Sequence, residues 1–320
     1  MADNDGRLRL ILGTMTFGAR ADAPQVRAML EAALRLGIKE LDTAYVYQNG
    51  DSERVLGAAL QAFAPGSFRI AAKVSPKPTG RLDRDAVLSQ LGTSLQRLGV
   101  EKADVLYLHF PNHATPLAQT LEACMELREA GKFGELGLSN FPASLVLEAA
   151  EICAVRGWEA PTVYEGVYNA FSRSSEALMP TLRAAGMRFA AYNPLAGGLL
   201  CGKYHTAGQL PQTGRFADMP GYRDRYWKES YFAGLSPVRR ACAEADISMT
   251  DAALRWLQFH SRLDASAGDG VILGVSGLAQ LLQNAAACGH GPLPATVAQA
   301  FEEGWLLCAK DAPPYYRFIG

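Results

Sequence analysis

Residues 133–156 read FGELGLSNFPASLVLEAAEICAVR, a short apolar run followed at once by a longer amphipathic segment. Phe133–Ser139 has the length of a buried strand, while Ala143–Arg156 repeats apolar residues at the three- and four-residue spacing of a helix. A strand followed by a helix of this length is typical of βαβ units, which build a parallel sheet. The fold therefore depends on how often this unit recurs.

The unit recurs along the whole chain of 320 residues. The strand candidates are Leu8–Leu12, Ile38–Asp42, Phe68–Lys73, Asp104–His109, Phe133–Ser139, Thr162–Glu165, Met187–Tyr192 and Val271–Gly274. The helix candidates are Ala23–Leu36, Ser52–Phe63, Asp83–Leu98, Pro116–Ala130, Ala143–Arg156, Ser175–Ala185, Pro237–Ala245, Thr250–His260, Leu278–Cys288 and Ala295–Ala309. Eight such units predict an α/β fold, a (β/α)8 TIM barrel that forms one domain over residues 1–320. Residues 193–235 add a long loop after the seventh strand, and the last segment adds an extra C-terminal helix.

A doubly wound sheet is the structural alternative, and it usually has fewer strands. Its dinucleotide-binding form begins with a Gly-x-Gly-x-x-Gly turn, whereas the turn after the first strand, Gly13–Gly18, reads GTMTFG. The sequence also contains no Gly-x-x-x-x-Gly-Lys-Ser/Thr stretch, which argues against a P-loop. The barrel remains the favoured fold.

The composition excludes several classes of protein. There are 31 basic and 32 acidic residues, so nothing supports a nucleic-acid or anionic-membrane partner. Hydrophobic residues make up 49% and charged residues 20%, as in ordinary globular proteins. The six cysteines form no Cys-x-x-Cys pair, which indicates free thiols in a reducing compartment. With a polar N-terminus and no long apolar run, we expect a soluble cytoplasmic protein.

Polar or reactive side chains follow the predicted strands. In chain order they are Asp42, Lys73, His109, Ser139 with Asn140, Glu165, Tyr192 with Asn193, and Gly274 with Ser276. A single polar residue at a strand end often only marks where the chain meets water. The active site of a (β/α)8 barrel, however, is built at the carboxyl ends of its strands. We therefore expect these side chains to converge on one mouth.

The first three of these residues suggest chemistry only as a group. A half-buried Lys73 needs a carboxylate partner, and Asp42 on the neighbouring strand is the natural one. The alternative is a purely structural ion pair, and His109 alone is more often a satisfied core histidine than a catalyst. Pro111 interrupts the helix that His109 and His113 would need to share a metal, so no metal site is expected.

Together these residues resemble the tetrad of aldo-keto reductases: Asp42, Tyr47 five residues later, Lys73 on strand three and His109 on strand four. The resemblance spans essentially the whole chain. It continues through GLSNF at 137–141, YNPLAGGLL at 192–200, GKY at 202–204, ILGVS at 272–276 and QN at 283–284. The YNPLAGGLL stretch and YRDRYWK at 222–228 are similar to the aflatoxin-aldehyde and succinic-semialdehyde reductase subgroup.

The resemblance implies reduction of aldehydes, and some ketones, to alcohols by hydride transfer from NADPH. In this mechanism Tyr47 donates the proton that the new alcohol needs. Lys73 is expected to lower the pKa of Tyr47, and Asp42 to hold the ammonium in place. His109 is expected to donate to the carbonyl oxygen and so to bind the substrate.

The resemblance also assigns a cofactor site and a substrate site. The cofactor residues are Asp42, Ser139, Asn140, Glu165, Tyr192, Asn193, Pro194, Leu195, Gly197, Gly198, Leu199, Lys203, Arg215, Gly274, Ser276, Gln280, Gln283 and Asn284. The substrate residues are His109, Tyr222, Arg225 and Arg317, which predict a preference for carboxylate-bearing or aromatic aldehydes. The alternative for the two arginines is that Arg225 pairs with Asp224 or a neighbouring acid and that Arg317 belongs to a frayed tail.

Three positions depart from the family pattern. Glu165 stands where the subgroup usually has a glutamine, and a carboxylate cannot donate to the carboxamide oxygen of the cofactor. Ala279 and Leu282 replace polar residues of the usual adenosine-binding segment. These departures bear on the choice between NADPH and NADH.

Three other properties stay open at this stage. A non-catalytic NADPH-binding regulatory barrel subunit is the main functional alternative; such subunits carry an extra N-terminal segment, whereas strand one is expected here at Leu8–Leu12. A phosphate-binding isomerase or lyase barrel would lack the tetrad. The oligomeric state is also open: the chain is either a monomer or the homodimer that this subgroup often forms.

Overall fold

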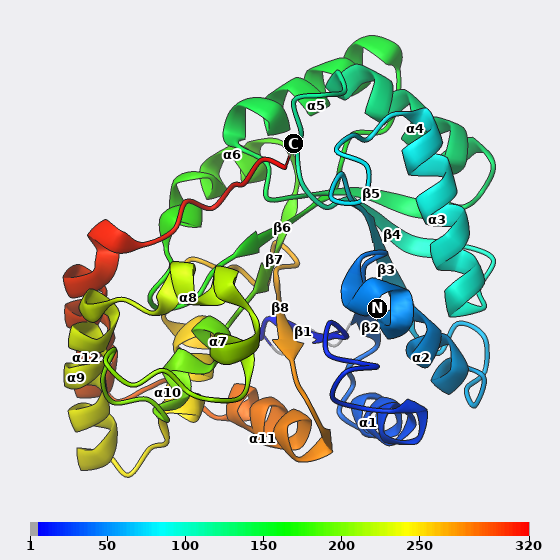
Figure 1. Cartoon of the computed structure of the whole chain (residues 1–320). Helices are drawn as coiled ribbons and strands as arrows, with labels where there is room; N and C mark the ends of the chain where they lie inside the picture. The colour runs from blue at the N-terminus through cyan, green and yellow to red at the C-terminus, as the bar shows by residue number, and fades with distance from the viewer. Residues whose placement is uncertain (1–5, 320) are drawn as a thin grey trace.

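The computed structural model describes residues 6–319 as a closed barrel of eight parallel strands (Figure 1). Residues 1–5, which begin the polar N-terminal segment, and residue 320 lie outside the described residues. The strands are β1 (Arg9–Gly13), β2 (Glu40–Asp42), β3 (Arg69–Val74), β4 (Ala103–Leu108), β5 (Phe133–Ser139), β6 (Val163–Val167), β7 (Arg188–Tyr192) and β8 (Gly270–Gly274). The predicted α/β barrel is therefore confirmed.

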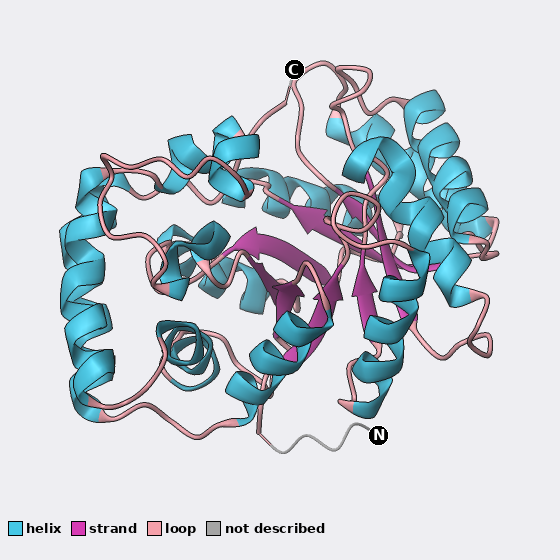
Figure 2. Cartoon of the chain, turned by 60° about the horizontal axis from the view of Figure 1, so that its bottom comes forward, coloured by secondary structure: helices cyan, strands magenta, loops and turns pink. Residues whose placement is uncertain are grey.

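Helices follow the strands and surround the barrel (Figure 2). The helices are α1 (Ala23–Arg35), α2 (Asp51–Leu60), α3 (Arg84–Leu98), α4 (Leu117–Glu129), α5 (Ala143–Arg156), α6 (Met179–Ala184), α7 (Arg215–Asp218), α8 (Pro220–Tyr226), α9 (Glu229–Glu244), α10 (Met249–Phe259), α11 (Leu278–Gly289) and α12 (Ala295–Cys308). Four short 3-10 turns are η1 (Tyr47–Gly50), η2 (Ser174–Ala177), η3 (Ala196–Cys201) and η4 (Ala309–Asp311). Between residues 6 and 319, no helix has both the length and the apolar character needed to cross a membrane.

The barrel has a packed interior of its own, separate from the larger core between strands and helices. Its side chains are Ile11, Ala71, Val105, Tyr107, Val163, Ala190 and Ile272. Tyr107 fits because Gly137 on the adjacent strand leaves room: a Cβ there would lie 2.5 Å from the Tyr107 ring. The filled interior leaves only the ends of the strands free to carry a site.

Two predicted helices are wrong in extent. The helix predicted over Pro237–Ala245 begins at Glu229, as α9, and runs through Pro237. Proline normally ends a helix because it has no N–H for the carbonyl four residues earlier. Here tertiary packing outweighs that loss: α9 lies along α12, with Gly234 and Gly304 so close that a Cβ on either would meet the other's carbonyl oxygen. The helix predicted over Ser175–Ala185 is divided into η2 and α6.

The long loop after β7 and the C-terminal tail both lie at the carboxyl ends of the strands. The loop contains η3, α7 and α8 and is held by packed rings of Tyr204, Phe216 and Trp227, whose centres are 4.9–5.4 Å apart. The tail, red in Figure 1, returns from α12 to the ends of β4 and β5. There the Arg317 N–H donates to the Asn140 carbonyl at 3.1 Å, and the Ile319 N–H to that of Pro111 at 3.1 Å.

Candidate active site

The predicted pair of Asp42 and Lys73 is present at the carboxyl ends of β2 and β3. The Lys73 ammonium donates to the Asp42 carboxylate and, at 2.9 Å, to the Thr43 carbonyl oxygen. Lys73 is fully buried. A buried ammonium is costly unless a carboxylate and further acceptors surround it, and both are supplied here.

Glu165, at the third position of β6, approaches the same ammonium from across the barrel. Its Oε2 lies 3.1 Å from the Lys73 Nζ, and the side chain is buried. Burial works against the charged ammonium, but Asp42 and Glu165 together leave the pKa of Lys73 above its ordinary value. Burial and the neighbouring Asp42 raise the pKa of Glu165 well above its ordinary value. The site thus contains two acids around one base.

Tyr47 begins the η1 turn and joins this cluster at the mouth. Gln48 and Asn49 after it adopt left-handed backbone conformations, with φ of 49° and 53°. The Lys73 Nζ lies 5.4 Å from the centre of the Tyr47 ring, and the His109 ring meets that ring edge-on at 5.9 Å between centres. The structure therefore brings together all four residues that the tetrad spacing selects.

The expected lowering of the Tyr47 pKa by Lys73 is wrong. Loss of hydration raises the pKa of Tyr47 well above its ordinary value, and the Asp42 and Glu165 carboxyls raise it further. The physical reason is that Tyr47 is shielded from water and that the Lys73 ammonium is already paired with the Asp42 carboxylate. Tyr47 accordingly keeps its proton throughout the neutral range.

His109 is buried where β4 ends, and its surroundings favour the neutral imidazole. Burial, then the positive charges of Lys73 and Lys77, hold the pKa of His109 well below its ordinary value. Its ring stacks on Phe110 at 4.4 Å, and its backbone carbonyl accepts from the Asn140 side chain at 3.0 Å. Its Nδ1 is buried and has no hydrogen-bond partner within residues 6–319. A neutral imidazole offers one donor and one acceptor.

Ser139, Asn140 and Tyr192 form a connected group at the ends of β5 and β7. The Tyr192 hydroxyl donates to the Asn140 side-chain oxygen at 2.7 Å, and the Asn140 amide donates to the Ser139 hydroxyl at 2.9 Å. Asn140 holds a left-handed φ of 62°. Ser139 also pairs in register with Glu165, so this group lies beside the charged cluster.

The loop after β7 exposes backbone rather than side chains. Gly197 and Gly198 have φ of 70° and 101°, whereas the side chains of Pro194 and Leu199 are buried. A Cβ on Gly197 would lie 2.7 Å from the Tyr222 ring. Leu195 lies at the start of the same η3 turn and is half-buried. Contacts from this segment to a ligand would therefore come from N–H groups.

The residues predicted for the phosphate end lie around the start of α11. Gly274, Ser276, Gln280 and Gln283 are exposed, whereas Asn284 is buried. The Ser276 N–H and hydroxyl both donate to the Gln280 side-chain oxygen at 2.9 Å. Unpaired N–H groups at a helix start favour an anion.

The cations predicted from the long loop are half-buried or exposed. Lys203 is exposed, and the Arg215 guanidinium lies 5.0 Å from the centre of the Tyr222 ring. The Tyr222 hydroxyl donates to the Asn193 side chain at 3.1 Å. The Arg225 guanidinium lies at similar distances from the centres of two rings, 6.0 Å from that of Tyr222 and 5.9 Å from that of Tyr226.

Neither of the two arginines predicted for the substrate site is paired with an acid in residues 6–319. The groups beside the Arg225 guanidinium are tyrosines, so the alternative in which Arg225 pairs with Asp224 or a neighbouring acid does not hold. The Arg317 backbone is held by Asn140, so Arg317 does not belong to a frayed tail. Sequence reasoning missed Lys77, which lies beyond β3 with its ammonium 4.8 Å from the centre of the Phe110 ring. Partial burial, then Arg317 and Arg225, lower the pKa of Lys77. The sequence feature that could have indicated Lys77 is its position four residues after Lys73, just beyond the same strand.

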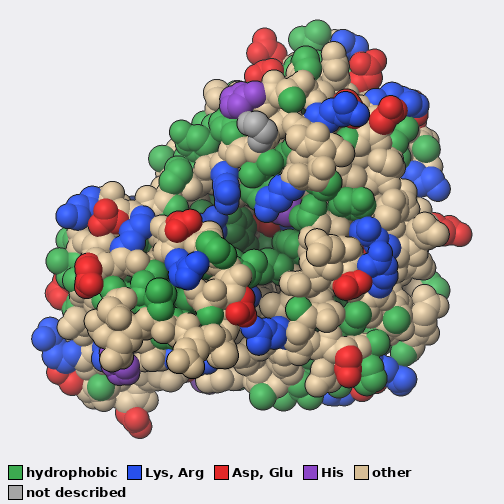
Figure 3. Space-filling view, viewed as in Figure 1, with side chains coloured by type: hydrophobic (Ala, Val, Ile, Leu, Met, Phe, Trp, Pro, Cys, Tyr) green, Lys and Arg blue, Asp and Glu red, His purple; other side chains and the backbone are tan. Residues whose placement is uncertain are grey.

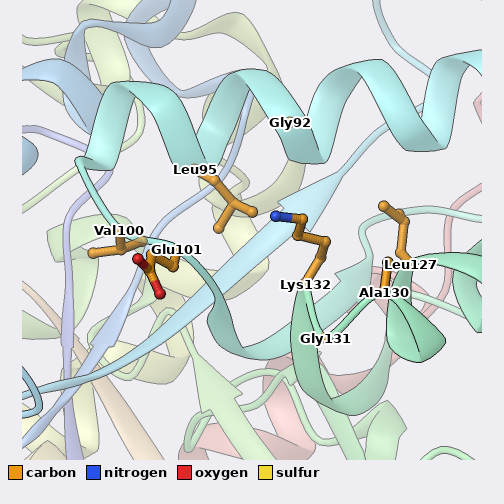
Figure 4. A pocket seen from close by; sticks show the side chains of 8 residues that line it. All are labelled: Gly92, Leu95, Val100, Glu101, Leu127, Ala130, Gly131 and Lys132. Carbon is orange, nitrogen blue, oxygen red and sulfur yellow. The ribbon is translucent and has the colours of Figure 1, made fainter.

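Figure 3, viewed as Figure 1, shows a hollow at the centre of this face, with Lys and Arg side chains at its rim and a His side chain inside it. A separate cavity of about 480 Å³ lies between α3 and α4 (Figure 4). Its lining includes Glu101 and Lys132, which precede β4 and β5, so it opens at the opposite ends of the strands from the tetrad. In the part of the chain that the structure describes, no three acidic, histidine or cysteine side chains gather as a metal site would require.

Comparison with known proteins agrees with this geometry. The sequence model of the Aldo/keto reductase family matches residues 9–305. Aflatoxin B1 aldehyde reductase member 2 from Rattus norvegicus is 46% identical over 320 residues, covering 96% of this chain and 87% of that protein. Aldo-keto reductase family 7 member A3 from Homo sapiens is 45% identical over 322 residues, 96% of each chain. Oxidoreductase sirO from Leptosphaeria maculans is 34% identical, again over 96% of each chain.

Proposed function

Because the chain belongs to the aldo/keto reductase family, we propose that it reduces aldehydes, and some ketones, to alcohols with NADPH and prefers carboxylate-bearing or aromatic aldehydes. The observation that supports this most strongly is the convergence of four side chains at one barrel mouth. These are Asp42, Tyr47, Lys73 and His109. In this arrangement Tyr47 can donate a proton, Lys73 places a positive charge beside it, and His109 adds a second hydrogen-bond donor.

The residues present fit the nicotinamide cofactor. Ser139 and Asn140 offer a hydroxyl and an amide beside the charged cluster, and Tyr192 offers an aromatic plate next to them. The left-handed Gly197 and Gly198 carry no side chain that would keep a pyrophosphate away from the backbone, although the Gly198 N–H itself donates to the Leu195 carbonyl at 2.8 Å. When bound, the cofactor supplies the hydride.

Tyr47 is proposed to donate the proton to the carbonyl oxygen of the substrate. Its raised pKa keeps the phenol protonated at neutral pH, which suits an acid in reduction better than a base in oxidation. The neutral His109 ring, edge-on to Tyr47, would donate to the same oxygen and orient the aldehyde. As the phenol gives up its proton, the Lys73 ammonium stabilises the negative charge that forms, and Asp42 holds that ammonium in place.

The free arginines at the mouth lead to a prediction about substrate charge. Arg225→Ala and Arg317→Ala should each lower kcat/KM for 2-carboxybenzaldehyde by about 1.5–3 kcal/mol, roughly 10- to 150-fold, the scale of a hydrogen bond to a charged group. The reason is that neither guanidinium has an acid partner within residues 6–319, so a substrate carboxylate supplies one. Benzaldehyde serves as the neutral comparison. Equal losses for both aldehydes would mean that the arginines only hold the loop and tail in place.

A second prediction concerns the cofactor. We expect a lower KM for NADPH than for NADH, and Lys203→Ala should reduce that preference about two- to fivefold, the scale of an exposed ion pair. Lys203 is exposed in the segment proposed to wrap the phosphates. Lys102→Ala, which changes another exposed lysine, just before β4, is the matched control. Equal KM values for both cofactors in the wild type would refute the proposed NADPH preference.

The reaction itself is tested by a turnover screen over neutral, aromatic and carboxylate-bearing aldehydes with NADPH. We expect turnover of aromatic aldehydes, fastest where a carboxylate is present. A protein that binds NADPH, measured by quenching of tryptophan fluorescence, but turns over no aldehyde in the screen would instead act as a binding subunit.

A further inference from the structure

Three charged side chains from three strands meet inside the mouth, and one of them departs from the family pattern. Asp42 and Glu165 are each 3% exposed, and Lys73 between them is 0% exposed. The ammonium donates to the Asp42 carboxylate and lies 3.1 Å from the Glu165 Oε2. Water therefore reaches none of the three charges appreciably.

The charges of this cluster do not balance if both acids are ionised. Two carboxylates around one ammonium leave a net negative charge in a buried site, which is strongly unfavourable. The other titratable groups that face Glu165 add no positive charge. They are Tyr47 from η1, Tyr107 from β4, Tyr192 from β7 and Tyr164 from its own strand. His109 is neutral as well.

We propose that Glu165 works as a neutral carboxylic acid, holding a proton that it donates to the Asp42 carboxylate and leaving one carboxylate and one ammonium in the site. Asp42 keeps the negative charge because it makes the closer contact with Lys73. Burial and Asp42 raise the pKa of Glu165 well above its ordinary value, which agrees with this assignment.

A protonated carboxyl has the hydrogen-bonding character of a glutamine amide, because it has one group that donates and one that accepts. Glu165 pairs in register with Ser139, beside the proposed nicotinamide site. In the neutral form it can therefore serve where the family pattern has an amide. Its ionisation at alkaline pH would add a negative charge beside Tyr47 and Lys73 and would weaken proton donation. This kinetic consequence rests on the proposed function, whereas the proton on Glu165 does not.

Infrared spectroscopy of the full chain alone, at neutral pH in D2O, tests the proton directly. The wild type should show the C=O stretch of a protonated carboxyl, and Glu165→Gln should lose it. Glu122→Gln, which changes an exposed acid on α4, should lose only carboxylate bands. A wild-type minus Glu165→Gln difference that contains only carboxylate bands would overturn the proposal, and so would a protonated-carboxyl band that persists unchanged in the variant.

Stability gives a second measurement on the same variants. Unfolded Glu165 loses its proton near the ordinary pKa of 4.5, but folded Glu165 keeps it to higher pH. The unfolded state then binds fewer protons, so the free energy of unfolding of the wild type should fall relative to Glu165→Gln as the pH rises above about 4.5. Parallel pH profiles would overturn the proposal.

The pH dependence of kcat is the third measurement. The alkaline decline of the wild type should move to higher pH in Glu165→Gln, and the opposite shift would contradict the proposed effect on Tyr47. A protonated-carboxyl band in a protein without reductase activity would refute the proposed function and leave the inference about Glu165 standing.

Discussion

Tyr47→Phe is expected to lower kcat for aldehyde reduction about 10²–10⁴-fold while leaving NADPH binding close to that of the wild type. The substitution removes the only proton donor of that side chain and keeps its ring, which contacts His109 edge-on. Because the pKa of Tyr47 is raised, the wild-type phenol is fully protonated at neutral pH, and the whole loss should appear in the proton-transfer step. Steady-state kcat and fluorescence titration with NADPH measure the two effects separately.

Tyr45→Phe is the matched control for this variant. Tyr45 lies two residues earlier, but its ring packs against the Arg97 guanidinium at 4.6 Å. Losing the Tyr45 hydroxyl should change kcat by less than about a factor of two, because Tyr45 is not among the residues proposed to act on the substrate. If Tyr47→Phe kept more than about a tenth of the wild-type kcat, proton donation would have to come from another group.

Lys73→Met is expected to damage both activity and stability. The ammonium lies 5.4 Å from the centre of the Tyr47 ring, and at an effective dielectric constant of about 20 its attraction for a phenolate there is roughly 3 kcal/mol, or on the order of 10² in kcat. Removing it also leaves the buried Asp42 without its ionic partner, which should lower the free energy of unfolding by about 3–5 kcal/mol. Urea unfolding and steady-state kinetics measure the two losses.

A double variant separates the two effects of Lys73. Asp42 is the carboxylate left without its partner in Lys73→Met, so adding Asp42→Asn removes that charge and part of the lost stability should return. The activity should not return, because no cation remains beside Tyr47. A Lys73→Met protein that kept both its stability and its kcat would contradict the proposed role of the ammonium.

The barrel could be predicted because its unit is local. Segments such as Phe133–Ser139 and Ala143–Arg156 carry their own periodicity, and both agree with the structure in full. The start of α9 was predicted wrongly at Pro237. The effect of a proline on a helix is local, whereas the packing of α9 on α12 involves residues far apart in the chain. Spacing along the chain therefore predicts elements better than it predicts their ends.

The same distinction applies to the site. Asp42 and Lys73 could be paired from the sequence because their strands are neighbours in a barrel. The contact between Glu165 and Lys73 could not be predicted, because β6 approaches that ammonium from across the barrel interior. The expected effect of Lys73 on the Tyr47 pKa failed because burial of the phenol and the Asp42 carboxylate beside the ammonium both favour the neutral phenol. Lys77 was missed because only the folded tail brings Arg317 near it.

Isotope tracing tests the proposed hydride transfer from NADPH to an aldehyde most directly. Purified protein would be given 2-carboxybenzaldehyde and NADPH carrying deuterium at one of the two C4 positions, and the product would be analysed by mass spectrometry. We expect an alcohol with one deuterium on its carbinol carbon from one labelled cofactor and none from the other, because Tyr192 is proposed to fix one ring face toward the substrate. An alcohol without deuterium from either cofactor, or bound NADPH with no alcohol formed, would contradict it.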